Sequence, residues 1–170
     1  MKNIRSQNGV GLVEVLVAVL LLSVAVLGFS ALQLQAVKAT EESLVRTQAL
    51  SVVRGLAENM RANPLKTQTY QDAINTPDAT ATTCKALSDK CTSEQIAIKE
   101  ANAAVKKLKE YDIKVSMNTC PGTASFSEIK CIIAAWGETK PIMNDTDTLA
   151  CSTVMGVYKS GSTCIIVEAY

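Results

Sequence analysis

The sequence predicts an α+β protein in which one long N-terminal helix precedes an antiparallel sheet. Two observations support the long helix: an apolar run from residue 10 to residue 34, and a helical pattern that continues it to residue 62. The third observation is a set of four strand-like runs in the C-terminal part, after a second helical segment. A helix followed by consecutive strands with short connections is typical of the α+β class.

The N-terminal apolar run is long enough to cross a bilayer. From Val10 to Leu34, 25 residues, Glu14 is the only charged residue. A helix of that length spans about 37 Å, whereas the apolar region of a secretory signal peptide has only about 7–15 residues. Lys2 and Arg5 precede the run, so the positive-inside rule places the N-terminus in the cytoplasm and everything after residue 34 outside it.

The helical pattern continues to Ala62, because Pro64 then disfavours helix for Asn63. We expect the half from Val45 to Met60 to lay one apolar face on the C-terminal domain. Gly55 within it is expected to permit close approach of the sheet, at a cost of about 1 kcal/mol relative to alanine. The apolar stripe comprises Leu34, Val37, Val45, Ala49, Val52, Leu56 and Met60.

Residues 64–91 are rich in turn-forming and small residues, which predicts a loop. Residues 92–111 predict a second helix, because Thr92 and Gln95 have the spacing of a capping box. Lysines in its last turn are favoured by the helix dipole and are expected to be solvated. The expected buried face is Ile98, Ala101, Val105 and Leu108, and the lysines are Lys106, Lys107 and Lys109.

Four runs then have strand character, and their short connections predict an antiparallel sheet. The first run alternates, with Ile113, Val115 and Met117 on one face. The runs are `YDIKVSMNT` (111–119), `IKCIIAAWGE` (129–138), `TLACSTVMGVY` (148–158) and `TCIIVEAY` (163–170).

All six cysteines follow the apolar run, on the side expected to be non-cytoplasmic, and therefore predict disulfides in an oxidising compartment. A zinc site is disfavoured because the chain has no histidine and no C-x₂-C pair. Six cysteines leave 15 pairings open. The spacing favours the nearest-neighbour set, in which the second pair bridges two strands around a turn and the third is the remainder: Cys84–Cys91, Cys120–Cys131 and Cys151–Cys164.

The sequence contains no recognisable catalytic motif. It has no histidine, no glycine-rich phosphate loop and no serine nucleophile motif. Asp145 and Asp147 lack the remaining ligands of a calcium loop, which favours an exposed polar turn. The net charge of +1 gives no support for a nucleic-acid partner. We therefore expect no enzymatic activity, no cofactor, no metal and no nucleic acid.

Glu14 requires an explanation, because a carboxylate at the centre of a membrane helix costs about 2.5–3.5 kcal/mol and is usually paired. Glu14 lies nearer the edge of the run, so its cost is lower but not negligible. No Lys or Arg lies between residues 6 and 37, so this helix supplies no partner. A cut after Gly9 would create a positive amine on Val10. Gly9 followed by `VGLVEVLVAVLLLSVAVLG` resembles the class III signal of type IV pilins: a short basic leader, Gly before the cut, an apolar residue after it, and Glu at the fifth mature position.

This resemblance implies that a prepilin peptidase cuts between Gly9 and Val10 and methylates the new amine of Val10. Glu14 would then pair with that amine on a neighbouring subunit during assembly. Many members have Phe after the cut, whereas this chain keeps the position apolar with Val. The implied architecture is a pilin fold, with residues 1–9 as leader, 10–34 as the transmembrane or filament-core half of the helix, and 35–170 as the head.

The segment from Cys84 to Glu138 resembles PilV-type minor pilins, called type IV pilus modification proteins, in its cysteine-flanked loops, its helix and its strand ending in Trp136. This implies a non-catalytic minor pilin that helps prime assembly and sits at the pilus tip. Its partners would be other minor pilins, the major pilin, the prepilin peptidase and the inner-membrane assembly machinery. The head would be periplasmic before assembly and extracellular in the pilus.

Two other functions remain open from the sequence. A minor pseudopilin of a type II secretion system shares the same signal, although the six cysteines and the `AAWGE` run disfavour it. A tip adhesin or DNA-binding module on a pilin stem is the alternative from another class.

Overall fold

The structure is a computed structural model that describes residues 11–77, 84, 90–123 and 128–169. The chain forms two compact units, residues 1–42 and 43–170. Helix α1 (Leu12–Ala62) contributes to both. Helix α1 ends at Ala62, which is the end expected from Pro64.

In the first unit, every described residue from Gly11 to Glu42 is exposed. The most apolar window of α1 has a mean hydropathy of 2.8. Among the helices of the described residues, α1 is the one that is long and apolar enough to cross a membrane. The hydroxyl groups of Ser23 and Ser30 donate to the carbonyl oxygens of Val19 and Val26, at 2.7 and 2.9 Å. Because these polar groups are satisfied within the helix, its surface suits lipid or a bundle of other helices.

The second unit begins with the end of α1 and adds the 3₁₀ turn η1 (Pro64–Lys66), α2 (Thr67–Asn75) and α3 (Ser93–Lys109). The prediction of a loop from residue 64 is therefore wrong for its first part. Proline stands at the first position of η1, where a missing N–H costs nothing. The remainder of the expected loop lies mostly outside the described residues. The buried residues of α2 have the spacing of one helix face: Tyr70, Ala73 and Ile74.

Helix α3 begins with the expected capping box. The Thr92 hydroxyl oxygen accepts from the Gln95 N–H at 3.3 Å, and the Gln95 side-chain oxygen accepts from the Thr92 N–H at 2.9 Å. The buried face is broadly as predicted, with Ala97 added to Ala101 and Leu108, whereas Ile98 and Val105 are half-buried against the core.

The main sheet contains three antiparallel strands in the order β1 (Lys114–Thr119), β2 (Lys130–Ala135) and β5 (Cys164–Ala169). The central strand β2 places Ile132 opposite Met117 on one side and Val167 on the other. This central position explains why all six residues of β2 are buried.

The third predicted strand, residues 148–158, does not extend this sheet. Only Ala150–Ser152 of the run 148–158 forms a strand, β4. It pairs in parallel with β3 (Lys140–Met143), a strand that was not predicted from the sequence. Pro141 lies within β3, and proline disfavours a strand assignment because it cannot donate to a ladder. The single four-stranded meander is therefore wrong, and a three-stranded and a two-stranded sheet replace it.

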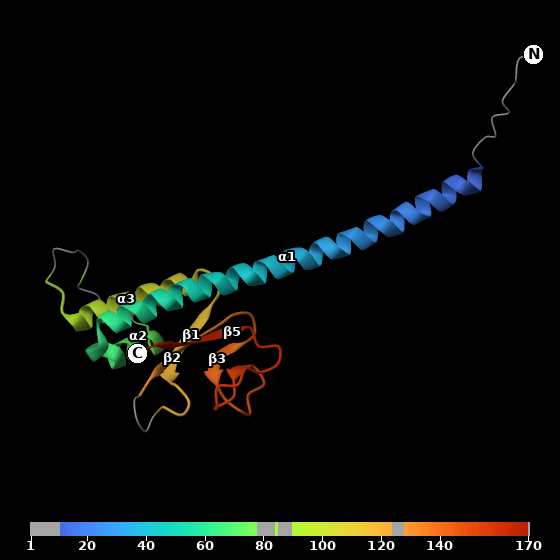
Figure 1. The fold of residues 1–170 in the computed structure, drawn as a ribbon. Helices are drawn as coiled ribbons and strands as arrows, with labels where there is room; N and C mark the ends of the chain where they lie inside the picture. The colour runs from blue at the N-terminus through green and yellow to red at the C-terminus, as the bar shows by residue number, and fades with distance from the viewer. Residues whose placement is uncertain (1–10, 78–83, 85–89, 124–127, 170) are drawn as a thin grey trace, which may run out of the picture. The chain divides into compact units, whose positions relative to one another are not determined.

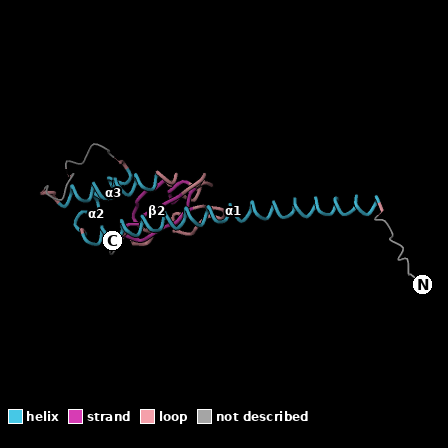
Figure 2. Tube along the Cα trace, turned by 90° about the horizontal axis from the view of Figure 1, so that it is seen from above, coloured by secondary structure: helices cyan, strands magenta, loops and turns pink. Residues whose placement is uncertain are grey.

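Both faces of the main sheet are covered. The end of α1, together with α2 and α3, lies over one face (Figure 1; Figure 2). The second sheet lies on the other face, where Met143 packs against a smaller cluster containing Ile133 and Cys151. The main core collects residues from the three helices and the sheet, among them Val53, Leu56, Met60, Tyr70, Ile74, Leu108, Met117, Ile132 and Ile165.

Side chains also close the edges of the main sheet. The Asn75 side chain accepts from the Met117 N–H and donates to the Met117 carbonyl oxygen, each at 2.9 Å, so it replaces a neighbouring strand at β1. On β5, the Tyr158 hydroxyl oxygen accepts from the Ile166 N–H at 2.9 Å. Such contacts prevent uncontrolled pairing of edge strands with other chains.

Gly55 does not serve a close approach of the sheet. It is exposed, and a Cβ at this position would have no neighbouring atom within 4 Å. The expectation fails because the glycine lies on the solvent side of α1, whereas Leu56 and Ala57 face the core.

We expect Gly55→Ala to stabilise the head by about 1 kcal/mol, the difference in helix propensity between the two residues. Urea unfolding of the full chain in detergent, followed by circular dichroism, measures the change. The matched control is Gly156→Ala, which should destabilise because Gly156 has φ +83°. A loss of stability in Gly55→Ala would contradict the placement of this residue.

Candidate assembly site and the disulfide-bonded head

Glu14 lies in the first turn of α1. Its N–H donates to the carbonyl oxygen of Gly11 at 2.9 Å, and the N–H of Val15 donates to the same oxygen at 3.3 Å. A carboxylate at this position interacts favourably with the helix dipole, which is worth about 0.3–1 kcal/mol. A charge at the centre of a membrane helix costs about 2.5–3.5 kcal/mol, and the cost at Glu14 is lower because this residue lies near the edge of the apolar run. A cation beside the carboxylate would offset the cost that remains.

No cation from the described part of the chain pairs with Glu14. The next basic residue along α1 is Lys38, 24 residues further on, which corresponds to about 36 Å of helix. Glu14 takes part in none of the ion pairs of the described residues. The predicted cleavage and methylation residues, Gly9 and Val10, lie outside the described residues.

Three disulfides brace the head, and no cysteine is free. The bond from Cys120 to Cys131 links the segment after β1 to β2, and the bond from Cys151 to Cys164 joins the second sheet to the main sheet. The structure has the three pairs of the nearest-neighbour set, with Cα–Cα distances of 5.7 Å for Cys84–Cys91, 5.0 Å for Cys120–Cys131 and 5.9 Å for Cys151–Cys164.

A buried polar contact between α2 and α3 was not visible in the sequence. Tyr70 is fully buried, and its hydroxyl donates to the carboxylate of Glu100. Burial raises the pKa of Tyr70, and the hydrogen bond to Glu100 raises it further. The apolar spacing of α2 could have placed Tyr70 in the core, but nothing local indicates a partner thirty residues away.

The loop containing Asp145 and Asp147 is held by two lysines. The Lys159 ammonium donates to the carbonyl oxygens of Asp145 at 3.0 Å and Asp147 at 2.6 Å. The Lys140 ammonium lies 2.7 Å from the Asp147 carboxylate, and this bond lowers the pKa of Asp147. Within the described ranges, no cluster of three acidic, cysteine or histidine residues could hold a metal ion.

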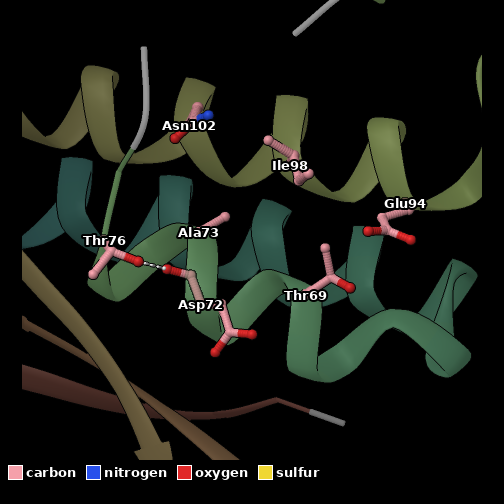
Figure 3. A pocket seen from close by; sticks show the side chains of 7 residues that line it. All are labelled: Thr69, Asp72, Ala73, Thr76, Glu94, Ile98 and Asn102. Carbon is pink, nitrogen blue, oxygen red and sulfur yellow. Dashed lines mark hydrogen bonds between the residues drawn. The ribbon is translucent and has the colours of Figure 1, made fainter. Parts of the chain in front are cut away.

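A groove of about 270 Å³ lies between α2 and α3 (Figure 3). Its polar groups are engaged locally: the Thr76 hydroxyl donates to the Asp72 carbonyl oxygen at 2.6 Å, and Glu94 pairs with Lys66 at 3.3 Å. Nothing in this arrangement combines a nucleophile with a base. The lining residues are Thr69, Asp72, Ala73, Thr76, Glu94, Ile98 and Asn102.

Two family models match consecutive parts of the chain. Residues 4–30 match the prokaryotic N-terminal methylation motif, and residues 31–113 match the family described as type IV pilin Tt1218. The chain belongs to the type IV pilin family. Pilins of this family are structural and non-catalytic. The methylation motif implies processing by a prepilin peptidase and handling by the pilus assembly machinery.

The fold of this type IV pilin is the expected α+β arrangement, with a long N-terminal helix, an antiparallel sheet and disulfides in the head. The apolar helix and the methylation motif are consistent with anchoring in the inner membrane and incorporation into a pilus. Neither the curated proteins nor the solved structures include a match to the chain.

We expect Asp147→Asn to destabilise the head at pH 7 and to have little effect near pH 2. Because the pKa of Asp147 is lower in the folded chain, its contribution is complete above the unfolded value of about 3.9 and disappears as the pH falls through the folded value. Urea unfolding of both chains at the two pH values measures the difference. An equal difference at pH 7 and pH 2 would exclude an electrostatic role for Asp147.

Proposed function

We propose that this type IV pilin is a minor pilin that helps prime pilus assembly and sits at the pilus tip. It acts without catalysis, through packing of its N-terminal helix against the helices of other minor pilins. The observation that carries the proposal is Glu14, a single acid on a stretch of helix that is otherwise uncharged from Gly11 to Val37, with no ion-pair partner among the described residues. A partner from another subunit explains why the acid is present.

In the proposed mechanism, the prepilin peptidase cuts between Gly9 and Val10 and methylates the amine of Val10. Inside a bundle of packed helices, the Glu14 carboxylate of one subunit lies beside the Val10 amine of its neighbour. An unpaired charge in such surroundings costs several kcal/mol, so only the helix register that pairs the two groups is stable. The pair therefore specifies how far one helix is displaced along the next.

The minor subtype is supported by the resemblance of the segment from Cys84 to Glu138 to PilV-type pilins, and by a head braced with three disulfides. In this proposal residues 1–9 are the leader, residues 10–34 the membrane or filament-core segment, and residues 35–170 the head. The partners are other minor pilins and the major pilin. The head lies in the periplasm before assembly and outside the cell in the pilus.

We expect deletion of this chain to reduce surface pili and twitching motility, because a priming subunit acts before the shaft elongates. Electron microscopy of cells and a motility assay measure both, with re-expression of the chain as the control. Normal piliation together with a loss of exoprotein release would reject the proposal in favour of a type II secretion pseudopilin.

We expect Glu14→Ala and Glu14→Gln to leave membrane insertion intact but to block incorporation into pili, because both remove the charge that pairs with the Val10 amine. Glu14→Asp keeps the charge and should retain partial incorporation. Immunoblots of sheared pili and of the membrane fraction measure the two quantities. Incorporation of Glu14→Gln at the level of the unaltered chain would contradict the pairing mechanism.

A bulky residue at the proposed cleavage position should leave the full-length precursor in the membrane. Gly9→Leu introduces a side chain where the peptidase must approach the backbone closely, whereas Gly9→Ala should be cut in part. The ratio of precursor to mature chain on an immunoblot measures the processing. Complete cutting of Gly9→Leu would show that the processing site lies elsewhere.

A further inference from the structure

One asparagine of the head has the sequence of an acceptor for an N-linked sugar. Asn144 is followed by Asp145 and Thr146, and no other asparagine of the chain has Ser or Thr two positions after it. Sugars are attached to asparagine in the motif N-x-S/T, where x is not proline. Because this tripeptide also occurs by chance, the geometry must show whether its side chains are arranged for the reaction.

The tripeptide lies at the surface of the head, directly after β3. Asn144 follows Met143, the last residue of β3, and is half-buried, whereas Asp145 and Thr146 are exposed. The Asn144 N–H donates to the carbonyl oxygen of Ser152 in β4 at 2.9 Å. This bond fixes the backbone of the site against the second sheet and leaves the tripeptide accessible to an enzyme.

The side-chain amide of Asn144 is oriented through its oxygen. Oδ1 accepts from the Thr146 N–H at 2.8 Å, from the Thr146 hydroxyl at 2.9 Å and from the Asp147 N–H at 2.8 Å. Because the oxygen is held in the turn, the amide nitrogen Nδ2 is directed to the other side of the planar amide. Nδ2 is not one of the buried side-chain atoms that lack a partner among the described residues, so solvent reaches it.

The three donors also favour reaction at the amide nitrogen. An amide nitrogen is a weak nucleophile, and it becomes a stronger one as it loses a proton and negative charge develops on the amide oxygen. Donors directed at that oxygen stabilise the developing charge. The Thr146 hydroxyl is one of these donors. This contact gives a physical reason for a hydroxyl residue at the third position of the motif.

A patch of exposed apolar side chains borders the same turn. Residues 149–158, called here the apolar loop, expose five large apolar residues; Met155 is 75% and Val157 64% exposed. The Val154 N–H donates to the Asp145 carboxylate at 3.0 Å, so the loop and the tripeptide are in contact. An apolar patch that nothing covers promotes aggregation. The five residues are Leu149, Val154, Met155, Val157 and Tyr158.

We propose that Asn144 is an N-glycosylation site and that the attached sugar covers the apolar loop. In the reaction, a bond forms between Nδ2 and the anomeric carbon of a glycosyl diphosphate. The bond from that carbon to the phosphate oxygen breaks, the diphosphate leaves with the electron pair, and one Nδ2 proton passes to a base of the transferase. The C–H groups of the sugar then lie over the apolar side chains, and its hydroxyl groups stay in water. The site is independent of the proposed assembly role of the N-terminal helix.

The test is the intact mass of the full chain purified from its own cells, with the attachment site mapped by fragmentation that preserves the sugar. We expect a mass above that of the polypeptide by one or more sugar residues, located on Asn144. Thr146→Val should abolish the addition, whereas Thr146→Ser keeps the hydroxyl and should retain it. An unmodified Asn144, or an addition that survives Thr146→Val, overturns the proposal.

Asn144→Asp distinguishes a modification site from a turn with a purely structural role. The new carboxylate keeps an acceptor for the three donors but has no nitrogen to receive a sugar. We expect an unchanged circular dichroism spectrum, loss of the sugar, and a shift of aggregation to lower protein concentration, measured by light scattering in detergent. Adding Met155→Ser and Val157→Ser should reverse the shift. Aggregation of Asn144→Asp at the same concentration as the unaltered chain overturns the covering of the apolar loop.

Discussion

The central physical constraint on this protein is an apolar helix surface that water cannot stabilise. From Leu12 to Val37 the first unit exposes large apolar side chains all around the helix, and one carboxylate, Glu14, interrupts them. Lipid can cover the apolar residues before assembly, and packed helices of other subunits can cover them afterwards. The free energy of the carboxylate differs between the two environments, because helices of neighbouring subunits can supply an amine as its partner and hydrocarbon cannot. In the proposed mechanism, this difference drives the helix from the membrane into the pilus.

The head has a different requirement, which is to stay folded with a small core. The chain has two Phe and one Trp, so few large side chains are available for burial. The structure compensates by covering both faces of the main sheet, closing its edges with Asn75 and Tyr158, and adding three disulfides. A disulfide that closes a loop of about 15 residues contributes roughly 3 kcal/mol in the chain-entropy model. The charged loop near Asp147 is also stabilised by contacts within the head, from Lys140 to the Asp147 carboxylate and from Lys159 to the Asp147 carbonyl oxygen.

The elements that the sequence predicted well are those with a strong local signal. The unbroken apolar run and the downstream proline defined α1, and the capping box at Thr92 defined the start of α3. Helix α2 was missed because a proline and several small polar residues suggested a loop, although Tyr70 and Ile74 carried a helical spacing. The parallel pair of β3 and β4 was missed because it depends on contacts between distant segments, and no local pattern encodes those contacts.

In the candidate site, too, a residue with a local sequence signal was predicted, and contacts between distant segments were not. Glu14 was predicted as an assembly residue from its isolation in the sequence, and the structure adds that it stands in the first turn of α1, with no cation from the described residues beside it. The proposed partner belongs to a second subunit, so the structure of one chain does not test the pair. The contact between Tyr70 and Glu100 and the bracing by Lys159 could not be predicted, since each depends on how elements pack.

The most direct test is the N-terminal mass of the chain isolated from cell envelopes and from sheared pili. The account predicts a mature chain that begins at Val10 and carries one methyl group on its α-amine. A chain that still begins at Met1, or one that begins beyond Glu14, would lack either the amine or the acid, and would contradict assembly through this pair.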